Sequence, residues 1–260
     1  MRAKLPAYTT GWIFALTSDA FRSLYSLGRS FGCGLSYTNR ATGWSRMFAD
    51  ERSIVMTMVD QINTVLRKLP EWPLYILGAV PPAWLLWQGV AGGLGVDPVK
   101  VMEHQLGLWG LQLLIATLMV SPLRRYAGLN FLKFRRAFGL LAFSYIVLHL
   151  TVWVVLDMGL LWGQVLEDLV KRWYIIIGMV ALLLMIPLVW TSRKSSIRKM
   201  GRKWISLHRI TYVVALLGGT HFIMQEKVWT TQALTYFAVI ATLVALRVVW
   251  IRKRLPRTAA

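Results

Sequence analysis

The sequence has very little cysteine and few acidic residues. Among its 260 residues there is one cysteine, Cys33, which excludes a disulfide within the chain, a cysteine-type zinc site and a cysteine-held iron–sulfur cluster. Eleven Asp and Glu residues are outnumbered by 30 Lys and Arg residues, and all charged residues together make up only 16% of the chain. Apolar residues make up 56% and the mean hydropathy is +0.52, so the composition is that of a membrane protein and neither a soluble globule nor a disordered chain.

The common patterns of enzyme chemistry are also missing. The sequence has no nucleophile with a neighbouring base, no glycine-rich phosphate loop and no paired-carboxylate site. The connections between its apolar stretches are too short to form a soluble domain that binds a nicotinamide or flavin adenine dinucleotide. Any electrons that this chain handles are therefore expected to be exchanged with another protein or a membrane carrier.

Six apolar stretches are long enough, at about 1.5 Å per residue, to cross roughly 30 Å of hydrocarbon. The predicted fold class is an all-α membrane protein, a bundle of six transmembrane helices. We place these helices at 72–92, 104–122, 137–156, 174–191, 205–225 and 233–250.

Basic residues are concentrated in alternate connections. The connections between spans two and three and between spans four and five, and the segment after span six, contain the basic residues Arg124, Arg125, Lys133, Arg135, Arg136, Arg193, Lys194, Arg198, Lys199, Arg202, Lys203, Arg252, Lys253, Arg254 and Arg257. The connections 93–103, 157–173 and 226–232 are neutral or acidic. Because Lys and Arg bias a loop toward the cytoplasm, both termini are predicted to be cytoplasmic. The net charge of +19 is thus explained by topology, and no nucleic-acid partner is expected.

The predicted six-helix domain covers residues 58–255, followed by a cytoplasmic tail at 256–260. Residues 1–57 mix Gly, Ser, Thr and Arg with scattered aromatic residues, and no apolar run there is long enough for a signal peptide or a span. Our hypothesis is that translation starts at Met56 or Met58 and that the preceding segment is not native. The alternative is a disordered cytoplasmic tail, and N-terminal sequencing of the native protein separates the two.

All four histidines of the chain lie in or at the end of a predicted span. A histidine in the bilayer is expected to face the bundle interior and to have a partner there. His149 lies 13 residues after Arg136, about 20 Å along span three, and His221 lies about 8 Å before Glu226 at the end of span five. The two imidazoles are therefore predicted at similar depth in the outer half of the membrane, where they could clamp the iron of a b-type haem from both sides. Hydrogen bonding to a neighbouring helix is the alternative role.

Residues around these two histidines fit the same interpretation. Gly218 and Gly219 leave room for a porphyrin close to the helix that carries His221. Tyr145 and Trp153 lie four residues on either side of His149 and could line the ring, although packing or an interfacial position would explain them equally well.

The other two histidines have several interpretations. At the depth where a second haem would lie, nearer the cytoplasmic end of span three, the chain has Arg135 and Arg136 and no histidine. A second haem with two histidine ligands is therefore not predicted. His208 could ligate a second haem with a different partner, hold a haem propionate or cap its helix. His104 could serve a quinone, a propionate or a proton path, and solvation is its default role.

Four stretches of the sequence resemble the MsrQ (YedZ) family of the ferric-reductase-like transmembrane group. They are GLGVDPVKVMEHQLGLWGLQLLIATLMVSPLRR at 93–125, RRAFGLLAFSYIVLHLTVWVVLD at 135–157, KRWYIIIGMVALLLMIPLVWTS at 171–192 and GRKWISLHRITYVVALLGGTHF at 201–222. The similarity covers roughly 58–255, and the haem-associated histidines of the family fall on His149, His208 and His221.

The resemblance implies a haem b subunit, with one haem or two, in the bacterial inner membrane. Such a subunit passes electrons from the quinone pool to MsrP, a periplasmic molybdenum-cofactor enzyme that reduces methionine sulfoxide in oxidised proteins. The resemblance also implies FMN and leaves a cytosolic flavin reductase open as the electron donor. Two rival functions remain: a metalloreductase that reduces ferric or cupric ions directly, and a transporter or membrane anchor without a redox centre.

Overall fold

The computed structural model describes residues 57–226 and 230–254, and the described part consists of helices, turns and loops without a strand. The predicted extension at 1–57, apart from Thr57, and the predicted tail at 256–260 lie outside these residues. After a helical segment at 57–68, the α-helices are α3 (Trp72–Val90), α4 (Pro98–Pro122), α5 (Arg135–Thr151), α6 (Trp162–Lys171), α7 (Trp173–Trp190), α8 (Lys194–Met200), α9 (Arg202–Leu207), α10 (Ile210–Gln225) and α11 (Thr231–Arg254). Helices α4 and α5 each continue into a π-helical segment, η2 (Leu123–Ala127) and η3 (Val152–Asp157).

The all-helical fold class is confirmed, and four helices are long and apolar enough to cross a membrane. They are Pro98–Ala127, Arg135–Asp157, Trp173–Trp190 and Thr231–Ile251. The predicted spans 72–92 and 205–225 are also largely helical, but they fall short for different reasons. Helix α3 contains three prolines and three tryptophans, which lower its hydropathy. Helix α10 has only 16 residues because a turn at His208 and Arg209 separates it from α9, so the helix begins at Ile210.

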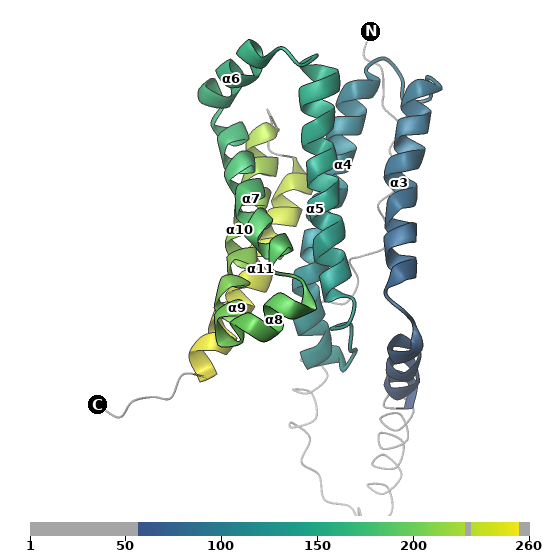
Figure 1. Ribbon diagram of the computed structural model, residues 1–260, viewed down its shortest axis with the longest axis vertical. Helices are drawn as coiled ribbons and strands as arrows, with labels where there is room; N and C mark the ends of the chain where they lie inside the picture. The colour runs from purple at the N-terminus through teal and green to yellow at the C-terminus, as the bar shows by residue number, and fades with distance from the viewer. Residues whose placement is uncertain (1–56, 227–229, 255–260) are drawn as a thin grey trace, which may run out of the picture. The chain divides into compact units, whose positions relative to one another are not determined.

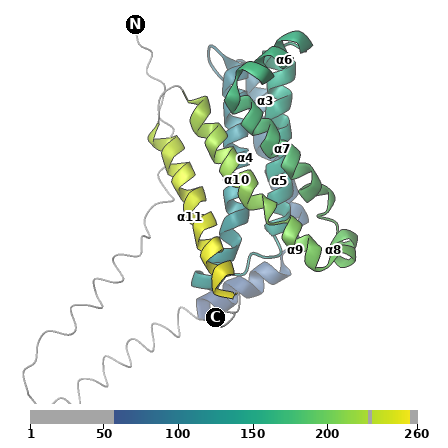
Figure 2. The same cartoon turned by 90° about the vertical axis from the view of Figure 1, so that its left-hand side faces the viewer.

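Helix α4 lies at the centre of the bundle. It packs against α3, α5, α10 and α11, while α7 packs against α5 and α10. Figures 1 and 2 show α3 beside α4 and α5 at one edge, and α11 beside α10 and α4 at the other. The main core is built from apolar side chains of α4, α5, α7, α10 and α11, with Leu114, Val214 and Ile240 almost fully buried.

A glycine allows α4 and α5 to approach closely. A Cβ atom at Gly110 would lie 2.9 Å from Ile146 Cγ1, a distance that a real side chain does not tolerate. Small residues at helix crossings are a common device in membranes because they let dispersion contacts form between the helices. This contact fixes the position of the half of α5 that carries His149 relative to α4.

Large apolar side chains cover much of the outside of the bundle. Leu77 and Val80 on α3 and Leu183 and Ile186 on α7 are exposed in the isolated chain. Exposure on this scale is unusual for a soluble protein and is expected where helices face lipid. The short helices lie at the two ends: α6 is at one end of the bundle and α8 and α9 are at the other (Figure 1).

Candidate functional site

The structure brings His149 of α5 and His221 of α10 together. Their ring centroids are 6.3 Å apart and the ring planes are inclined by 80°. Both side chains line a cavity of about 700 Å³, which we call the histidine cavity. It is lined by Lys100, Val101, Glu103, His104, Gln105, Gly107, Leu108, Leu111, Leu114, Ile146, His149, Leu150, Trp153, Asp157, Arg172, Tyr174, Ile175, Gly178, Met179, Ala181, Leu182, Met185, Val214, Gly218, His221, Phe222 and Gln225.

Each of the two rings is oriented by a backbone carbonyl of a neighbouring helix. His149 Nδ1 donates to the carbonyl of Glu103 at 2.8 Å, and His221 Nδ1 donates to the carbonyl of Tyr174 at 2.7 Å. Since a carbonyl can only accept, each Nδ1 carries the proton, and Nε2 of a neutral ring keeps its lone pair. A hydrogen bond of this kind is what orients metal-ligating histidines and fixes their tautomer.

A glycine faces each ring on the same neighbouring helix. A Cβ atom at Gly107 would lie 3.1 Å from His149 Nδ1, and one at Gly178 would lie 2.8 Å from His221 Nδ1. Each glycine follows the carbonyl residue by four positions, as Gly107 follows Glu103 and Gly178 follows Tyr174. The arrangement of imidazole, carbonyl and glycine therefore occurs twice, once between α4 and α5 and once between α7 and α10.

The spacing of the rings fits one metal ion between them. Two metal–imidazole bonds of about 2 Å, plus about 1 Å from each nitrogen to its ring centre, would place the centroids about 6 Å apart. The observed 6.3 Å agrees with this sum. In the described residues no group of three or more His, Cys, Asp or Glu side chains could hold a metal ion. Two imidazoles need further donors from elsewhere, and the four nitrogens of a porphyrin would supply them.

The two ends of the histidine cavity differ in polarity. Leu111, Leu114 and Val214 line it toward the middle of the bundle. Charged side chains line the end at which α4 begins, which we call the histidine end. There Lys100 Nζ lies 2.8 Å from Asp157 Oδ2 and 3.5 Å from Glu103 Oε2.

Two more polar groups complete the rim of this cavity. Arg172 Nε pairs with Asp168 Oδ1 at 3.2 Å. His104 accepts a hydrogen bond from Gln225 Nε2 at 3.4 Å through Nδ1, and its Nε2 lies 3.7 Å from Glu226 Oε1. His104 is thus part of the charged rim and is held apart from the histidine pair.

Two of the residues expected beside the haem do not line the histidine cavity. Tyr145 is buried but does not line the histidine cavity, because its hydroxyl donates to the carbonyl of Gly78 at 2.6 Å and its ring packs against Trp109. Gly219 faces α11, where an added Cβ would lie 3.1 Å from Ile240 Cδ1. Both residues therefore serve packing. Gly218 and Trp153 do line the cavity.

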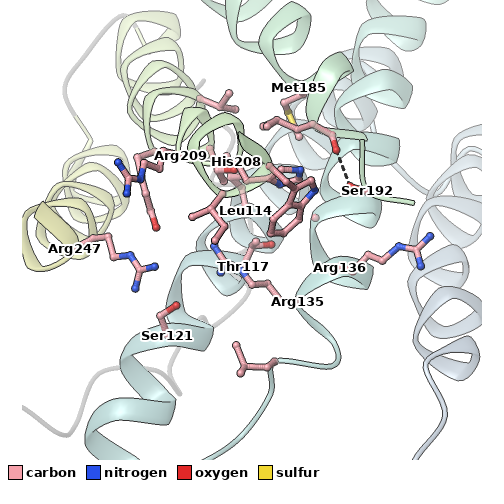
Figure 3. Close-up of a pocket in the computed structure, with 18 of the residues that line it drawn as sticks. Leu114, Thr117, Ser121, Arg135, Arg136, Met185, Ser192, His208, Arg209 and Arg247 are labelled. Atoms are coloured by element: carbon pink, nitrogen blue, oxygen red, sulfur yellow. Dashed lines mark hydrogen bonds between the residues drawn. The ribbon is translucent and has the colours of Figure 1, made fainter. Parts of the chain in front are cut away.

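His208 lies in a second cavity of about 910 Å³ at the other end of the bundle (Figure 3). It directly follows α9, and its ring stacks on Trp204 with a centroid distance of 4.0 Å. Its Nε2 lies 3.2 Å from Thr191 Oγ1, which itself donates to the carbonyl of Pro187 at 2.7 Å. Because the hydroxyl proton is already used, Thr191 accepts from His208 and occupies Nε2. No other histidine lines this cavity among the described residues.

Six arginines line this second cavity, which we call the arginine cavity, and no Asp or Glu does so among the described residues. Arg247 Nε is buried and has no hydrogen-bond partner in the described part of the chain. Figure 3 shows Arg135, Arg209 and Arg247 on three different elements around His208. The arginines are Arg124, Arg125, Arg135, Arg136, Arg209 and Arg247.

The features that sequence reasoning missed are the carbonyls of Glu103 and Tyr174, the two facing glycines, and the grouping of the arginines. The only sequence signal for the glycines is their helical spacing from the carbonyl residues, and this spacing says nothing without knowledge of the neighbouring helix. The sequence pattern explains Arg124, Arg125, Arg135 and Arg136 as cytoplasmic topology signals, and the structure adds that these four share one cavity with Arg209 and Arg247.

Comparison with known proteins places the chain in a family. A family model described as the ferric reductase like transmembrane component matches residues 106–219. The protein-methionine-sulfoxide reductase heme-binding subunit MsrQ of Brucella anthropi is 47% identical over 178 residues, which cover 68% of this chain and 81% of that protein. The MsrQ of Brucella ovis is 45% identical over 187 residues, which cover 71% and 85%. No solved structure matches the chain. The chain therefore belongs to the MsrQ family of protein-methionine-sulfoxide reductase heme-binding subunits.

Proposed function

We propose that the chain holds a b-type haem between His149 and His221 and passes electrons through it. The observation that carries this proposal is the pair of rings 6.3 Å apart, each with Nδ1 bound to a carbonyl and Nε2 left for a metal. The relatives are named as heme-binding subunits, which supports the same assignment. A haem with two protein ligands has no open coordination position, so it cycles between ferric and ferrous iron without activating dioxygen.

The polarity of the histidine cavity sets the orientation of the haem in this proposal. The two propionates of a haem are anionic, and burying them against Leu111, Leu114 and Val214 would cost several kcal/mol without a partner. The rim at the histidine end carries two cations, Lys100 and Arg172, each of which is paired with carboxylates in the structure. Lys100 and Arg172 would therefore be the side chains nearest the propionates of a bound haem, and Leu111, Leu114 and Val214 would contact its apolar edge.

The direction of electron transfer follows from the topology, which we propose as six spans with both termini in the cytoplasm of a bacterial cell. Helices α3 and α10 complete the six, and the basic connections lie on the cytoplasmic side. The histidine end then faces the periplasm. Electrons move outward from the quinone pool, or from a cytosolic flavin reductase, to a periplasmic molybdenum-cofactor reductase of the MsrP kind. The methionine sulfoxide chemistry, and with it the repair of oxidised periplasmic proteins, belongs to that partner.

The arginine cavity is the place in this proposal for the FMN that the family resemblance implies. Guanidinium groups bind phosphate with paired hydrogen bonds, and Arg247 Nε is buried without a protein partner. A second haem ligated by His208 is the alternative occupant. It is less well supported because Thr191 occupies His208 Nε2 and no other histidine lines the cavity in the described residues.

Optical spectroscopy of the purified protein tests the haem assignment. We expect a reduced-minus-oxidised spectrum of b-type, with the haem-to-protein ratio measured as the pyridine haemochrome. His149→Ala and His221→Ala should each lose most of this haem, while the rim variant His104→Ala should keep it. An unchanged spectrum in either ligand variant would contradict the proposal, and so would a colourless wild-type protein, which would favour a transporter or anchor.

Electron-transfer assays separate the subunit from a metalloreductase. In vesicles that contain the protein and reduced quinol, oxidation of the haem should depend on the added periplasmic partner. Fast haem oxidation by ferric or cupric chelates without that partner would favour direct metal reduction instead.

A further inference from the structure

Helix α6 has three distinct faces. At about 100° per residue, Val165 and Leu169 lie on one face, Trp162, Leu166 and Val170 on the next, and the polar residues on the third. Val165 is buried against Trp153 and Ile175, so the first face packs on the bundle. The polar residues are Gln164, Glu167, Asp168 and Lys171.

The second face is apolar but does not pack on the bundle. Trp162, Leu166 and Val170 are exposed by 64%, 61% and 77%. They follow one another at intervals of four residues, so they form a continuous stripe along the whole helix. A stripe of three large apolar side chains in a ten-residue helix is not explained by contacts within the described part of the chain.

The third face is suited to water. Lys171 forms an ion pair with Glu167, and the hydrogen bond from Lys171 lowers the pKa of the Glu167 carboxyl below its ordinary value. Asp168 pairs with Arg172 on the same side. The polar face and the apolar stripe therefore point in different directions from the same helix.

The position of α6 in the chain places the helix at one surface of the membrane. It begins five residues after Asp157, where one membrane-spanning helix ends, and one residue separates it from Trp173, where the next begins. Both ends of α6 are thus tied to the same face of the membrane. Trp173, the first residue of α7 and three residues after Val170, is exposed by 72%, so large apolar side chains are exposed on both sides of the junction between α6 and α7.

We propose that α6 lies in the membrane surface at the histidine end, with Trp162, Leu166 and Val170 inserted among the lipid chains and its polar face in water. An amphipathic helix with apolar residues on one face and charged residues on the other binds at the boundary between headgroups and acyl chains. Tryptophan is the residue type enriched at this boundary, and Trp162 begins α6 while Trp173 begins the next helix, α7. Lipid, and neither a second copy nor a partner protein, is the proposed occupant because both ends of α6 join membrane-spanning helices and the next exposed apolar side chain, Trp173, begins one of them.

Insertion of α6 into the membrane surface would also affect the histidine pair, although the proposal does not depend on haem binding. Val165 of α6 packs on Ile175, which directly follows Tyr174, and the carbonyl of Tyr174 accepts the hydrogen bond of His221. A helix held in the membrane surface would therefore fix the beginning of α7, and with it the orientation of the His221 ring.

Spin labels on α6 test this proposal in the full chain. In a Cys33→Ser background, which removes the only cysteine, single cysteines replace Leu166, Val170, Glu167 or Gln164 and carry a nitroxide label in lipid nanodiscs. Collisions with dioxygen report lipid, and collisions with a neutral, water-soluble nickel chelate report water. Labels at 166 and 170 should favour dioxygen severalfold over labels at 167 and 164.

The neighbouring pair Leu166→Cys and Glu167→Cys is the matched comparison, because both positions are exposed and lie on the same turn. Val170→Cys and Gln164→Cys repeat the comparison in case one variant does not fold. Equal access of the nickel chelate to 166 and 167 would overturn the proposal in favour of a water-exposed docking face. Protection of 166 from both reagents would overturn it in favour of contact with another protein chain.

Discussion

An alanine at Gly178 should displace the His221 ring. The added Cβ atom would lie 2.8 Å from His221 Nδ1 and 2.9 Å from Cε1, and ordinary contact begins at 3.4 Å. The ring must therefore move by about 0.6 Å, while its Nδ1 is held 2.7 Å from the carbonyl of Tyr174. Overpacking on this scale costs about 1–3 kcal/mol, and loss of an orienting hydrogen bond weakens metal binding by about 10–100-fold. We expect Gly178→Ala to lower haem affinity by the same 10–100-fold.

Titration of the haem-free protein with haemin measures this loss of affinity. Gly107→Ala serves as a milder substitution of the same kind, and Gly163→Ala serves as the control. At Gly107 the added Cβ would lie 3.1 Å from His149 Nδ1, so about 0.3 Å of movement is enough and a smaller loss is expected. At Gly163, on α6, an added Cβ meets nothing within 4 Å, and haem affinity should not change. Thermal unfolding of each haem-free variant checks that the bundle is intact. If Gly178→Ala binds haem as tightly as Gly163→Ala does, the facing glycines do not position the rings and the reasoning fails.

Three further predictions concern residues outside the histidine pair. Tyr145→Phe removes the hydrogen bond to the carbonyl of Gly78 and should lower the free energy of unfolding by about 1 kcal/mol without loss of haem, measured by thermal unfolding and absorbance. Lys100→Gln and Arg172→Gln each remove a positive charge near the proposed propionates, so the midpoint potential of the haem should fall by on the order of tens of millivolts in a redox titration. Arg247→Met should weaken FMN binding about tenfold or more, measured by flavin fluorescence, and leave the haem content unchanged; equal FMN binding would show that the phosphate is held elsewhere.

The helical fold class and the proximity of His149 and His221 could be predicted because both depend on the lengths of apolar runs and on residue spacing, which can be read from the sequence. Apolar runs and their lengths give helices, and a fixed rise per residue converts the distance from a charged end into a depth. The structure brings these two rings to a centroid distance of 6.3 Å. The start of the fifth span was harder to predict because hydropathy alone does not show that the helix is interrupted between α9 and α10 at His208 and Arg209.

The direction of a side chain around its helix could not be predicted in the same way. Tyr145 lies one helical turn from His149 and was expected to share its face, but its ring turns toward α3 and Trp109. Gly219 lies two residues before His221 but faces α11. Which side of a helix meets which neighbour depends on the packing of the whole bundle, and hydropathy and residue spacing do not give it.

The three histidines associated with the family differ in which ring nitrogen the protein occupies. Nδ1 of His149 and Nδ1 of His221 are bound to carbonyls, which leaves Nε2 on both rings for iron. At His208 the hydroxyl of Thr191 takes Nε2 instead, and the ring stacks on Trp204. A ring held in this way would have to give up its hydrogen bond before it could ligate through Nε2. The arginines around it favour an anion, which is why the proposal above gives the arginine cavity to FMN and keeps a second haem at His208 as the alternative.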